Sequence, residues 1–344
     1  MSSKKQMLSA VYAGPYKVEQ RWEDIPEPGK GELLLKIKYA GICGSDMLIY
    51  YGKHPRGREG IIMCHEFVGE VVELGANCSG KFKIGDRVAV EPLIACGSCQ
   101  PCLSRNYNVC ETLGLYGIDK HGGLAEYIAV PEKNLHLIPE RVTFEQAALL
   151  EPLAVACHVV DRSRVRLGSN VLVLGGGPIG YLIALVCKTA GVSYVGVSEV
   201  DPYRLRKLKE AGIEVINARE EDLQEAVLEK TKGNGVDIVF EAAGVTQTLR
   251  QATTITNIRG QIVIVALVSE PVPFDLTAVN FKEYDVIGSR TYTDKDYVTA
   301  LKLLEQGKAS VELLITHTLP LAEASRGFEI VAAGKEVMKV LIRP

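Results

Sequence analysis

The sequence predicts an α/β protein that combines a doubly wound parallel sheet with a second, β-rich domain. Three observations predict it. Six apolar, strand-like runs alternate with helix-like stretches between residues 170 and 290, a glycine-rich turn follows the first run, and short alternating strands occupy the first 150 residues. Apolar strands that alternate with helices are typical of a parallel sheet covered by helices. Short strands separated by glycine and proline turns are typical of a β-rich fold.

The β-rich part contains strands along which apolar and polar residues alternate. Glycine, proline and polar turns separate these strands, as expected for a sheet with one buried face. We expect the strands at residues 32–39, 67–74, 87–91 and 124–130.

The wound part follows the dipeptide Glu151-Pro152. Its six apolar strands begin at Val171, Tyr194, Glu214, Val236, Gln261 and Asp285. After them we expect a helix at 294–306, a second near 322–333, and a final strand with the sequence MKVLI.

The order of these elements predicts how the domains are built. The simplest arrangement is a wound domain at 153–290 inserted into a β-rich domain that comprises residues 1–152 and 291–344. The cleft between two such domains is the expected position of the functional site.

Composition limits the classes of function. The chain has 344 residues, of which 47% are hydrophobic and 24% charged, and its formal net charge is −3. This charge gives no indication of a nucleic-acid or membrane-surface partner. No uninterrupted apolar run of about 18 residues predicts a membrane span, and the first residues lack the apolar core of a signal peptide. We expect a cytoplasmic protein whose partner is a small molecule.

A dinucleotide site is indicated by the segment NVLVLGGGPIG. It places Gly175, Gly177 and Gly180 as GxGxxG between an apolar strand and a helix. The first glycine permits a tight turn, the second lets the backbone approach a pyrophosphate, and the third allows close helix–strand packing. The free N–H groups of the helix N-terminus would then bind phosphate. The expected cofactor contacts are Gly175, Gly177, Pro178, Ile179 and Gly180.

The choice of dinucleotide is indicated by Glu199. This residue ends the next strand, nineteen residues after Gly180. A carboxylate there can accept hydrogen bonds from the ribose hydroxyls and would repel a 2′-phosphate, which favours NAD over NADP. The alternative is an ordinary wound sheet without a cofactor, because glycine-rich turns also arise for structural reasons.

Four cysteines predict a structural zinc site. Cys96, Cys99, Cys102 and Cys110 follow the spacing C-x2-C-x2-C-x7-C. Four thiols so close together can surround one tetrahedral ion with no coordination position left open. An iron–sulfur cluster or free thiols are the alternatives, which we disfavour because no second cysteine group accompanies this one.

Seven short motifs occur in a characteristic order. They are GICGSD at Gly41, HEFVGEV at His65, GDRVAV at Gly85, the four-cysteine segment, GGLAEY at Gly122, EPLAV at Glu151 and GGGPIG at Gly175. Together they resemble the zinc-containing medium-chain alcohol dehydrogenases over nearly the whole chain. The resemblance implies a GroES-like catalytic domain with a structural zinc lobe, a Rossmann NAD-binding domain, and a homodimer or homotetramer.

The resemblance also implies a second, catalytic zinc. Cys43, His65 and Glu66 match its protein ligands, and Glu151 matches an acidic residue that either ligates the zinc or holds its water. An open position on Zn²⁺ lowers the pKa of a substrate hydroxyl, and the nicotinamide ring accepts the hydride. Taken alone, Cys43 and His65 would be interpreted as packed core residues. Ser45 matches the hydroxyl that passes the proton onwards.

Two further positions follow from the comparison with the family. Many members carry a histidine three residues after the proton-passing hydroxyl, and this chain has Leu48 there. The proton would then leave either through Tyr50 or His54, or through water and Glu66. A basic residue near the adenine is common in the family, and Arg204 matches it.

The expected substrate is a polyol or a sugar-like compound oxidised at a secondary hydroxyl. EPLAVACH resembles the sorbitol dehydrogenase branch. That branch often has an adjacent Arg-Tyr pair after the last wound strand, whereas here Thr291 separates Arg290 from Tyr292. The alternatives are a vicinal-diol or L-threonine-type dehydrogenase and, from a different class, a non-enzymatic protein that keeps the fold.

A basic segment raises the question of the substrate's charge. The sequence YYGKHPRGREG carries Lys53, His54, Arg56 and Arg58, opposed only by Glu59. Arginine there could bind a phosphate or carboxylate through paired hydrogen bonds, which predicts a phosphorylated or acidic substrate. The alternative is a solvated surface loop. The candidate substrate contacts are Tyr50, His54, Arg56 and Tyr292.

Overall fold

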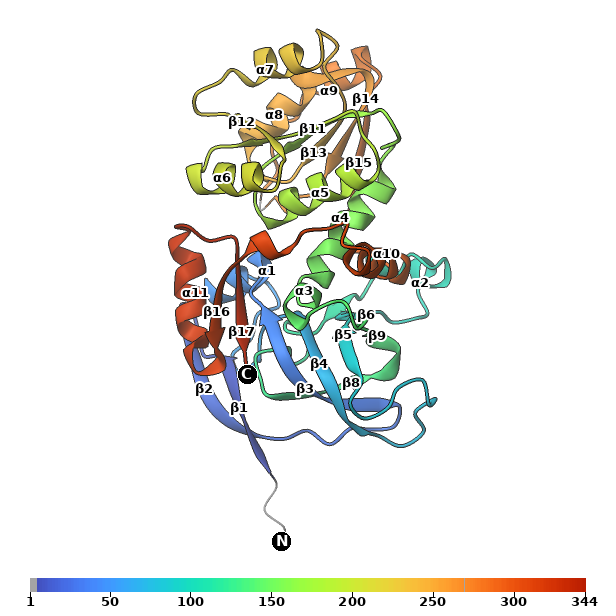
Figure 1. Ribbon diagram of the computed structural model, residues 1–344, viewed down its shortest axis with the longest axis vertical. Coiled ribbons are helices and arrows are strands. Elements are labelled where there is room, and N and C mark those ends of the chain that lie inside the picture. The colour runs from blue at the N-terminus through green and yellow to red at the C-terminus, as the bar shows by residue number, and fades with distance from the viewer. Residues whose placement is uncertain (1–4, 269) are drawn as a thin grey trace. The chain divides into compact units, whose positions relative to one another are not determined.

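The computed structural model describes residues 5–268 and 270–344. The chain divides into two compact units, and both α and β elements are present, as the sequence predicts (Figure 1). Unit 1 comprises Met1–Glu151 and Ile315–Pro344, and unit 2 comprises Pro152–Leu314.

Unit 1 is built on a sheet of seven strands in the order β16-β17-β3-β4-β5-β9, with β8 pairing β3. The strands are β3 (Glu32–Gly41), β4 (Glu66–Leu74), β5 (Arg87–Val90), β8 (Tyr127–Pro131), β9 (Leu135–Leu137), β16 (Ile315–Pro320) and β17 (Lys339–Arg343). Two small pairs accompany them, namely β1 (Gln6–Tyr12) with β2 (Val18–Asp24), and β6 (Leu93–Ile94) with β7 (Gly114–Leu115).

The core of unit 1 lies under the apolar side of this sheet. Leu33, Leu35 and Ile37 alternate along β3 and are buried, as are Val88 and Val90 of β5. Leu34 and Ala89, which lie between these residues, are buried as well, so both faces of these strands are covered at these positions.

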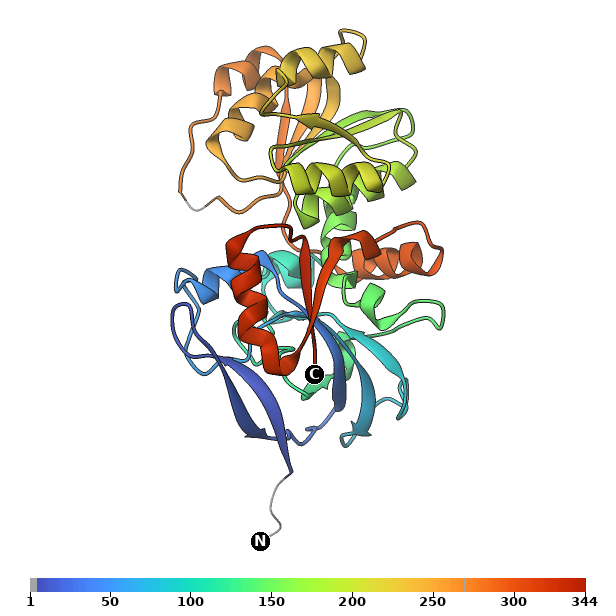
Figure 2. The same cartoon turned by 60° about the vertical axis from the view of Figure 1, so that its left-hand side comes forward.

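The end of the chain completes the sheet of unit 1. Between its last two strands, helix α11 (Ala324–Ala333) packs beside β16 and β17 (Figure 2). Strand β17 then pairs antiparallel with β3, so that Leu341 lies opposite Gly41, and Gly41 in turn lies opposite Glu66 of β4. The final strand is therefore only one strand away from the motif that begins at His65.

The remaining helices of unit 1 are short. They are α1 (Gly44–Tyr50), α2 (Gln100–Leu103), α3 (Phe144–Ala147), and the 3-10 turns η1 (Tyr107–Val109), η2 (Glu132–Asn134) and η4 (Leu321–Glu323). In α3, the Thr143 hydroxyl accepts the Gln146 N–H and the Gln146 side chain accepts the Thr143 N–H, which satisfies two backbone groups that a helix start leaves free.

Unit 2 is a sheet of six parallel strands in the order β12-β11-β10-β13-β14-β15. The strands are β10 (Asn170–Leu174), β11 (Tyr194–Glu199), β12 (Glu214–Asn217), β13 (Val236–Glu241), β14 (Thr256–Ile264) and β15 (Asp285–Gly288). The chain winds outwards from β10 first to one side and then to the other. The doubly wound sheet predicted from six apolar runs is thus confirmed.

Helices connect the strands of unit 2. They are α4 (Leu150–Arg162), which begins at the end of unit 1, α5 (Pro178–Thr189), α6 (Pro202–Glu210), α7 (Leu223–Lys230), α8 (Thr246–Ile255), α9 (Leu276–Phe281), α10 (Asp294–Glu305) and the turn η3 (Glu312–Leu314). Among the described residues, no helix has both the length and the apolarity needed to cross a membrane.

One domain boundary differs from the sequence-based expectation. Residues 291–314 belong to unit 2, whereas the sequence placed everything after 290 in the β-rich domain. The physical reason is a buried contact in which His158 Nδ1 of α4 lies 2.8 Å from Asp296 Oδ2 of α10. Asp296 also accepts the backbone N–H of Thr293, so the start of α10 is fixed to α4.

Candidate metal centres and dinucleotide site

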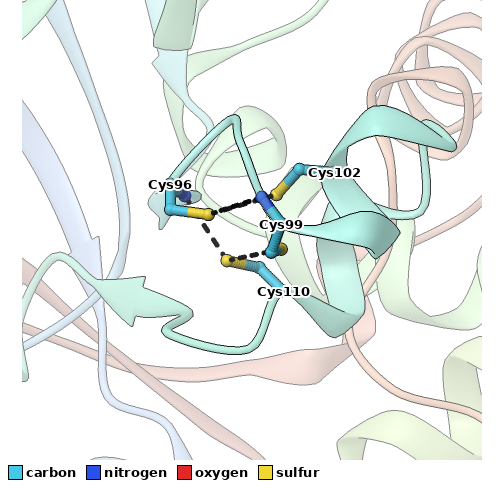
Figure 3. Close-up of side chains that lie close together, drawn as sticks. All are labelled: Cys96, Cys99, Cys102 and Cys110. Atoms are coloured by element: carbon cyan, nitrogen blue, oxygen red, sulfur yellow. Dashed lines mark hydrogen bonds between the residues drawn. The ribbon is translucent and has the colours of Figure 1, made fainter.

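The four-cysteine segment forms a compact cluster of sulfur atoms. The four Sγ atoms lie within 4.8 Å of one another, and Figure 3 shows the side chains converging. Cys96 and Cys102 are 3.9 Å apart, and Cys99 and Cys110 are 3.8 Å apart. Four sulfurs bound at about 2.3 Å to a tetrahedral ion would lie about 3.8 Å from one another. The cluster therefore fits a structural zinc without rearrangement.

The chain also favours the charged form of one of these thiols. The backbone N–H groups of Ser98 and Cys99 donate to Cys96 Sγ. They lower the pKa of Cys96 to about 5. Zinc binds the thiolate form of cysteine, so this arrangement prepares a ligand before the metal arrives.

A second group of metal donors is formed by Cys43, His65 and Glu66. One donor atom from each lies within 4.8 Å of the others. Cys43 precedes α1, while His65 and Glu66 stand at the start of β4. His65 is 4% exposed and Glu66 is completely buried. Thiolate, imidazole and carboxylate together are a donor set that suits zinc.

Asp46 connects the two segments that carry these donors. Its Oδ2 accepts the Cys43 N–H at 2.8 Å, and its Oδ1 accepts the Cys64 N–H at 3.2 Å. Oδ1 also lies 3.6 Å from Nδ1 of His65, a buried atom with no hydrogen-bond partner among the described residues. Burial lowers the pKa of His65, but Asp46 and Cys43 raise it by more, so the net pKa is well above its usual value. Asp46 thus stands where a carboxylate would orient a metal-binding imidazole.

A buried lysine that the sequence did not suggest contacts the same group. Lys339 Nζ donates to both oxygens of Glu66, at 2.8 and 2.7 Å, and to the Ile42 carbonyl at 3.2 Å. Burial alone would lower the pKa of Lys339, but Glu66 and then Cys43 raise it above its usual value. The sequence does hold one signal, because Lys339 is the single charged residue inside the apolar run VMKVLI.

The two other candidates near this group take different positions. Glu151, in the first turn of α4, is 8% exposed, and it lies outside the set of three close donors. It nevertheless lies near enough to contribute to the raised pKa of Lys339. Ser45 lies in α1, two residues after Cys43, and is half-buried.

The glycine turn of unit 2 has the geometry of a phosphate-binding turn. Gly175 has φ +101°, a conformation that side chains disfavour. A Cβ on Gly180 would lie 1.9 Å from the Gly175 carbonyl oxygen, so only glycine allows this contact. Gly177 is the N-cap of α5, and a Cβ there would meet only Arg204, at 3.7 Å. The N-terminus of α5 thus has room for a bulky anion.

The Glu199 carboxylate is held by backbone N–H groups of the glycine turn and of the residues that follow Glu199. Its Oε2 accepts the Gly176 N–H at 2.8 Å, and its Oε1 accepts the N–H groups of Val200 and Asp201. Arg204 lies 3.7 Å from Oε2. Asp201 caps α6 by accepting the Arg204 N–H, which holds this arginine beside the turn.

The candidate substrate residues are mostly held by the protein itself. Tyr50 is 4% exposed and its ring stacks on Phe328 at 5.3 Å, so it belongs to the core of unit 1. Tyr292, in unit 2, is completely buried and packs beside Tyr297. Both rings are packed inside the protein, and contact of either tyrosine with a substrate stays a prediction.

The basic segment is tied to the turn at residues 113–119. Arg56 donates to Asp119 Oδ2 at 2.8 Å and to the Leu113 carbonyl at 2.9 Å. Arg58 donates to the Asp119 carbonyl. His54 Nδ1 accepts the Arg56 N–H, and burial followed by Arg56 lowers its pKa. These contacts favour a structural loop over a binding site for an anion.

Two family profiles match the chain. "Alcohol dehydrogenase GroES-like domain" matches residues 29–140, and "Zinc-binding dehydrogenase" matches residues 178–306. The first lies in unit 1 and covers both groups of metal donors. The second lies in unit 2 and begins at the N-terminus of α5.

Characterised proteins resemble the chain over almost its full length. A sorbitol dehydrogenase of Halalkalibacterium halodurans is 37% identical over 96% of each chain. A 2-dehydro-3-deoxy-L-galactonate 5-dehydrogenase of Pseudoalteromonas atlantica is 37% identical over 98% of each. An Escherichia coli alcohol dehydrogenase, solved with its cofactor NADH, has a TM-score of 0.92 at 33% identity and matches 98% of this chain and 99% of its own. The chain therefore belongs to the zinc-dependent medium-chain alcohol dehydrogenase family.

Proposed function

We propose that the protein oxidises a secondary hydroxyl of a polyol or sugar-like substrate and transfers the hydride to NAD. The observation that carries this proposal is the set of half-buried Cys43 with buried His65 and Glu66, which combines a thiol, an imidazole and a carboxylate within 4.8 Å. A purely structural protein has no need of such a set beside a separate four-cysteine site. The glycine turn of unit 2 supplies the second requirement, a place for the dinucleotide.

In this proposal the residues of unit 1 bind and orient the metal. Cys43 and His65 would hold it, Glu66 would be a third ligand shared with Lys339, and Asp46 would keep the His65 ring in position. A bound zinc would act as a Lewis acid on the substrate hydroxyl. Glu151 lies outside the set of three close donors. In this proposal it would hold a water molecule or the substrate beside the metal. Ser45 would accept the hydroxyl proton and pass its own proton towards the cofactor ribose.

The residues of unit 2 bind the cofactor. The N–H groups at the start of α5 would bind the pyrophosphate, and Glu199 would accept hydrogen bonds from the ribose. Glu199 is already fixed by three backbone N–H groups, so it meets the ribose as a preorganised carboxylate. Bound NAD supplies the hydride-accepting ring.

The substrate class rests on the relatives and on the basic segment. The two relatives named above act, according to their names, on sorbitol and on a sugar acid. Arg56 and Arg58 are engaged by the turn at 113–119, which favours a neutral polyol. A phosphorylated or acidic substrate would have to bind the remaining donors of these arginines or displace these contacts.

A polyol panel tests the proposal. The zinc-loaded protein would be assayed for NADH formation with sorbitol, other neutral polyols, vicinal diols, L-threonine, and sugar acids and phosphates. We expect the highest kcat/KM with a neutral polyol. If a vicinal diol or L-threonine gives the highest kcat/KM, the proposed polyol class is wrong. If no compound leads to NAD reduction, the dehydrogenase assignment is wrong.

We also propose that the enzyme is cytoplasmic and forms a homodimer or homotetramer. Strand β15 is the last strand of its sheet, and an unpaired edge can pair with a second copy. Nearby in the sequence, Leu276 and Phe281 of α9 are 72% and 82% exposed. Light scattering of the purified protein measures the number of subunits directly.

A further inference from the structure

The Lys339–Glu66 pair is built across the middle strand of three. Lys339 lies on β17, Glu66 lies on β4, and Gly41 of β3 stands between them, opposite Glu66. A Cβ at Gly41 would lie 2.5 Å from Glu66 Oε2, so the carboxylate passes over this glycine to reach the ammonium. The side chains of the pair are 4% and 0% exposed. The ion pair is therefore buried within the sheet and depends on the glycine at position 41, unlike an ion pair on the surface.

The ammonium of Lys339 binds both oxygens of the Glu66 carboxylate. An ammonium has three N–H donors, and Lys339 has three acceptors, namely the two Glu66 oxygens and the Ile42 carbonyl. A carboxylate has about four lone-pair positions, so Glu66 can still bind a metal, but with both oxygens already bound to a cation it is a weaker donor. Here the ammonium is bound by both oxygens, and it opposes a metal that needs the same carboxylate.

We propose that Lys339 is a positioning residue that competes with zinc for Glu66. The inference rests on the proposed zinc at Cys43 and His65. Lys339 keeps Glu66 a weak ligand, so that a coordination position stays available to the substrate. Among the described residues, the Glu66 carboxylate has hydrogen bonds only to Lys339, so without the ammonium the partner that remains is the metal. An unpaired buried charge is costly, so the metal-free form is disfavoured and zinc binding becomes tighter.

The test is the zinc affinity of the second site in Lys339→Met, measured by competition with a chelator while the cysteine cluster remains loaded. We expect binding at least tenfold tighter than in the unchanged protein. Lys339→Arg keeps a cation and should bind zinc like the unchanged protein. In a Glu66→Gln background, Lys339→Met should change the affinity by less than twofold, because the contested carboxylate is gone.

The sign of the change decides between two roles. If Lys339 oriented Glu66 towards the metal, Lys339→Met would weaken zinc binding, typically 10–100-fold. That result, or an equal change in the Glu66→Gln background, would overturn the inference. If Lys339→Met does not fold, Lys339→Gln carries the same test, since it removes the charge but keeps a polar side chain.

A matched variant separates this inference from the proposed function. Cys43→Ala should abolish the second zinc and leave the first. If the unchanged protein binds no second zinc, the proposed metal site itself is wrong. If it binds two and Lys339→Met leaves the affinity of the second unchanged, only the competition is wrong.

Discussion

Asp46 Oδ1 lies 3.6 Å from Nδ1 of His65, and both residues are buried in unit 1. The same carboxylate accepts the backbone N–H groups of Cys43 and Cys64. One side chain thus fixes the loop that carries the thiol and the strand start that carries the imidazole.

This relationship predicts the effect of Asp46→Asn. An amide offers one acceptor where the carboxylate offers two, and it lacks the charge that orients the imidazole. Zinc affinity of the second site should fall about 10–100-fold, while the cysteine cluster keeps its metal. Metal analysis after dialysis against a weak chelator measures both. Asp161→Asn, which changes an exposed carboxylate paired with Lys295, is the control and should retain both ions.

Glu199→Ala should weaken NAD binding by about 1–3 kcal/mol, the scale of a lost hydrogen bond to a charged group. The measurement is the dissociation constant of NADH, followed by its fluorescence. The unchanged protein should bind NADP much more weakly than NAD, because Glu199 repels a 2′-phosphate. Equal use of both cofactors by the unchanged protein would refute this role for the carboxylate.

Glu151→Ala should lower kcat far more than it lowers cofactor affinity. Glu151 belongs to unit 1 and lies near the Lys339–Glu66 pair, whereas the glycine turn belongs to unit 2. Steady-state kinetics together with NADH binding separate the two effects. Parallel losses in both quantities would indicate that Glu151 supports the fold at the start of α4 instead.

Arg56→Ala should cost about 1 kcal/mol or less of stability, the usual scale for a partly exposed ion pair. The ratio of kcat/KM for a neutral polyol to that for its phosphate or aldonate should stay unchanged. Assays at low and high salt provide the comparison. A selective, salt-sensitive loss of activity on the anionic compound would restore the basic segment as a substrate site.

Much of the fold follows from local sequence patterns. Six apolar runs and the GxGxxG turn predict the wound sheet, because each of these signals is contained within a short stretch of sequence. The cysteine cluster is equally local, since its four thiols lie within fifteen residues. The domain boundary near residue 291 could not be predicted from local sequence, because the contact of His158 with Asp296 joins residues far apart in the chain.

The finer parts of the site depend on distant contacts. Lys339 reaches Glu66 only because β17 joins the sheet beside β3, and no local pattern fixes that pairing. Tyr50 stands close in sequence to Cys43 yet packs into the core against Phe328. Cys64 is buried and has a φ of +66°, a conformation that only the three-dimensional structure reveals. That conformation explains why glycine suits this position.

The zinc content of the unchanged protein and of Cys43→Ala tests the central claim most directly. The account predicts two zinc ions per chain in the unchanged protein and one in Cys43→Ala. It also predicts that Cys43→Ala folds normally, because the cysteine cluster is intact, and that it no longer reduces NAD with a polyol. One zinc ion per chain in both proteins, with equal NAD reduction, would contradict the account.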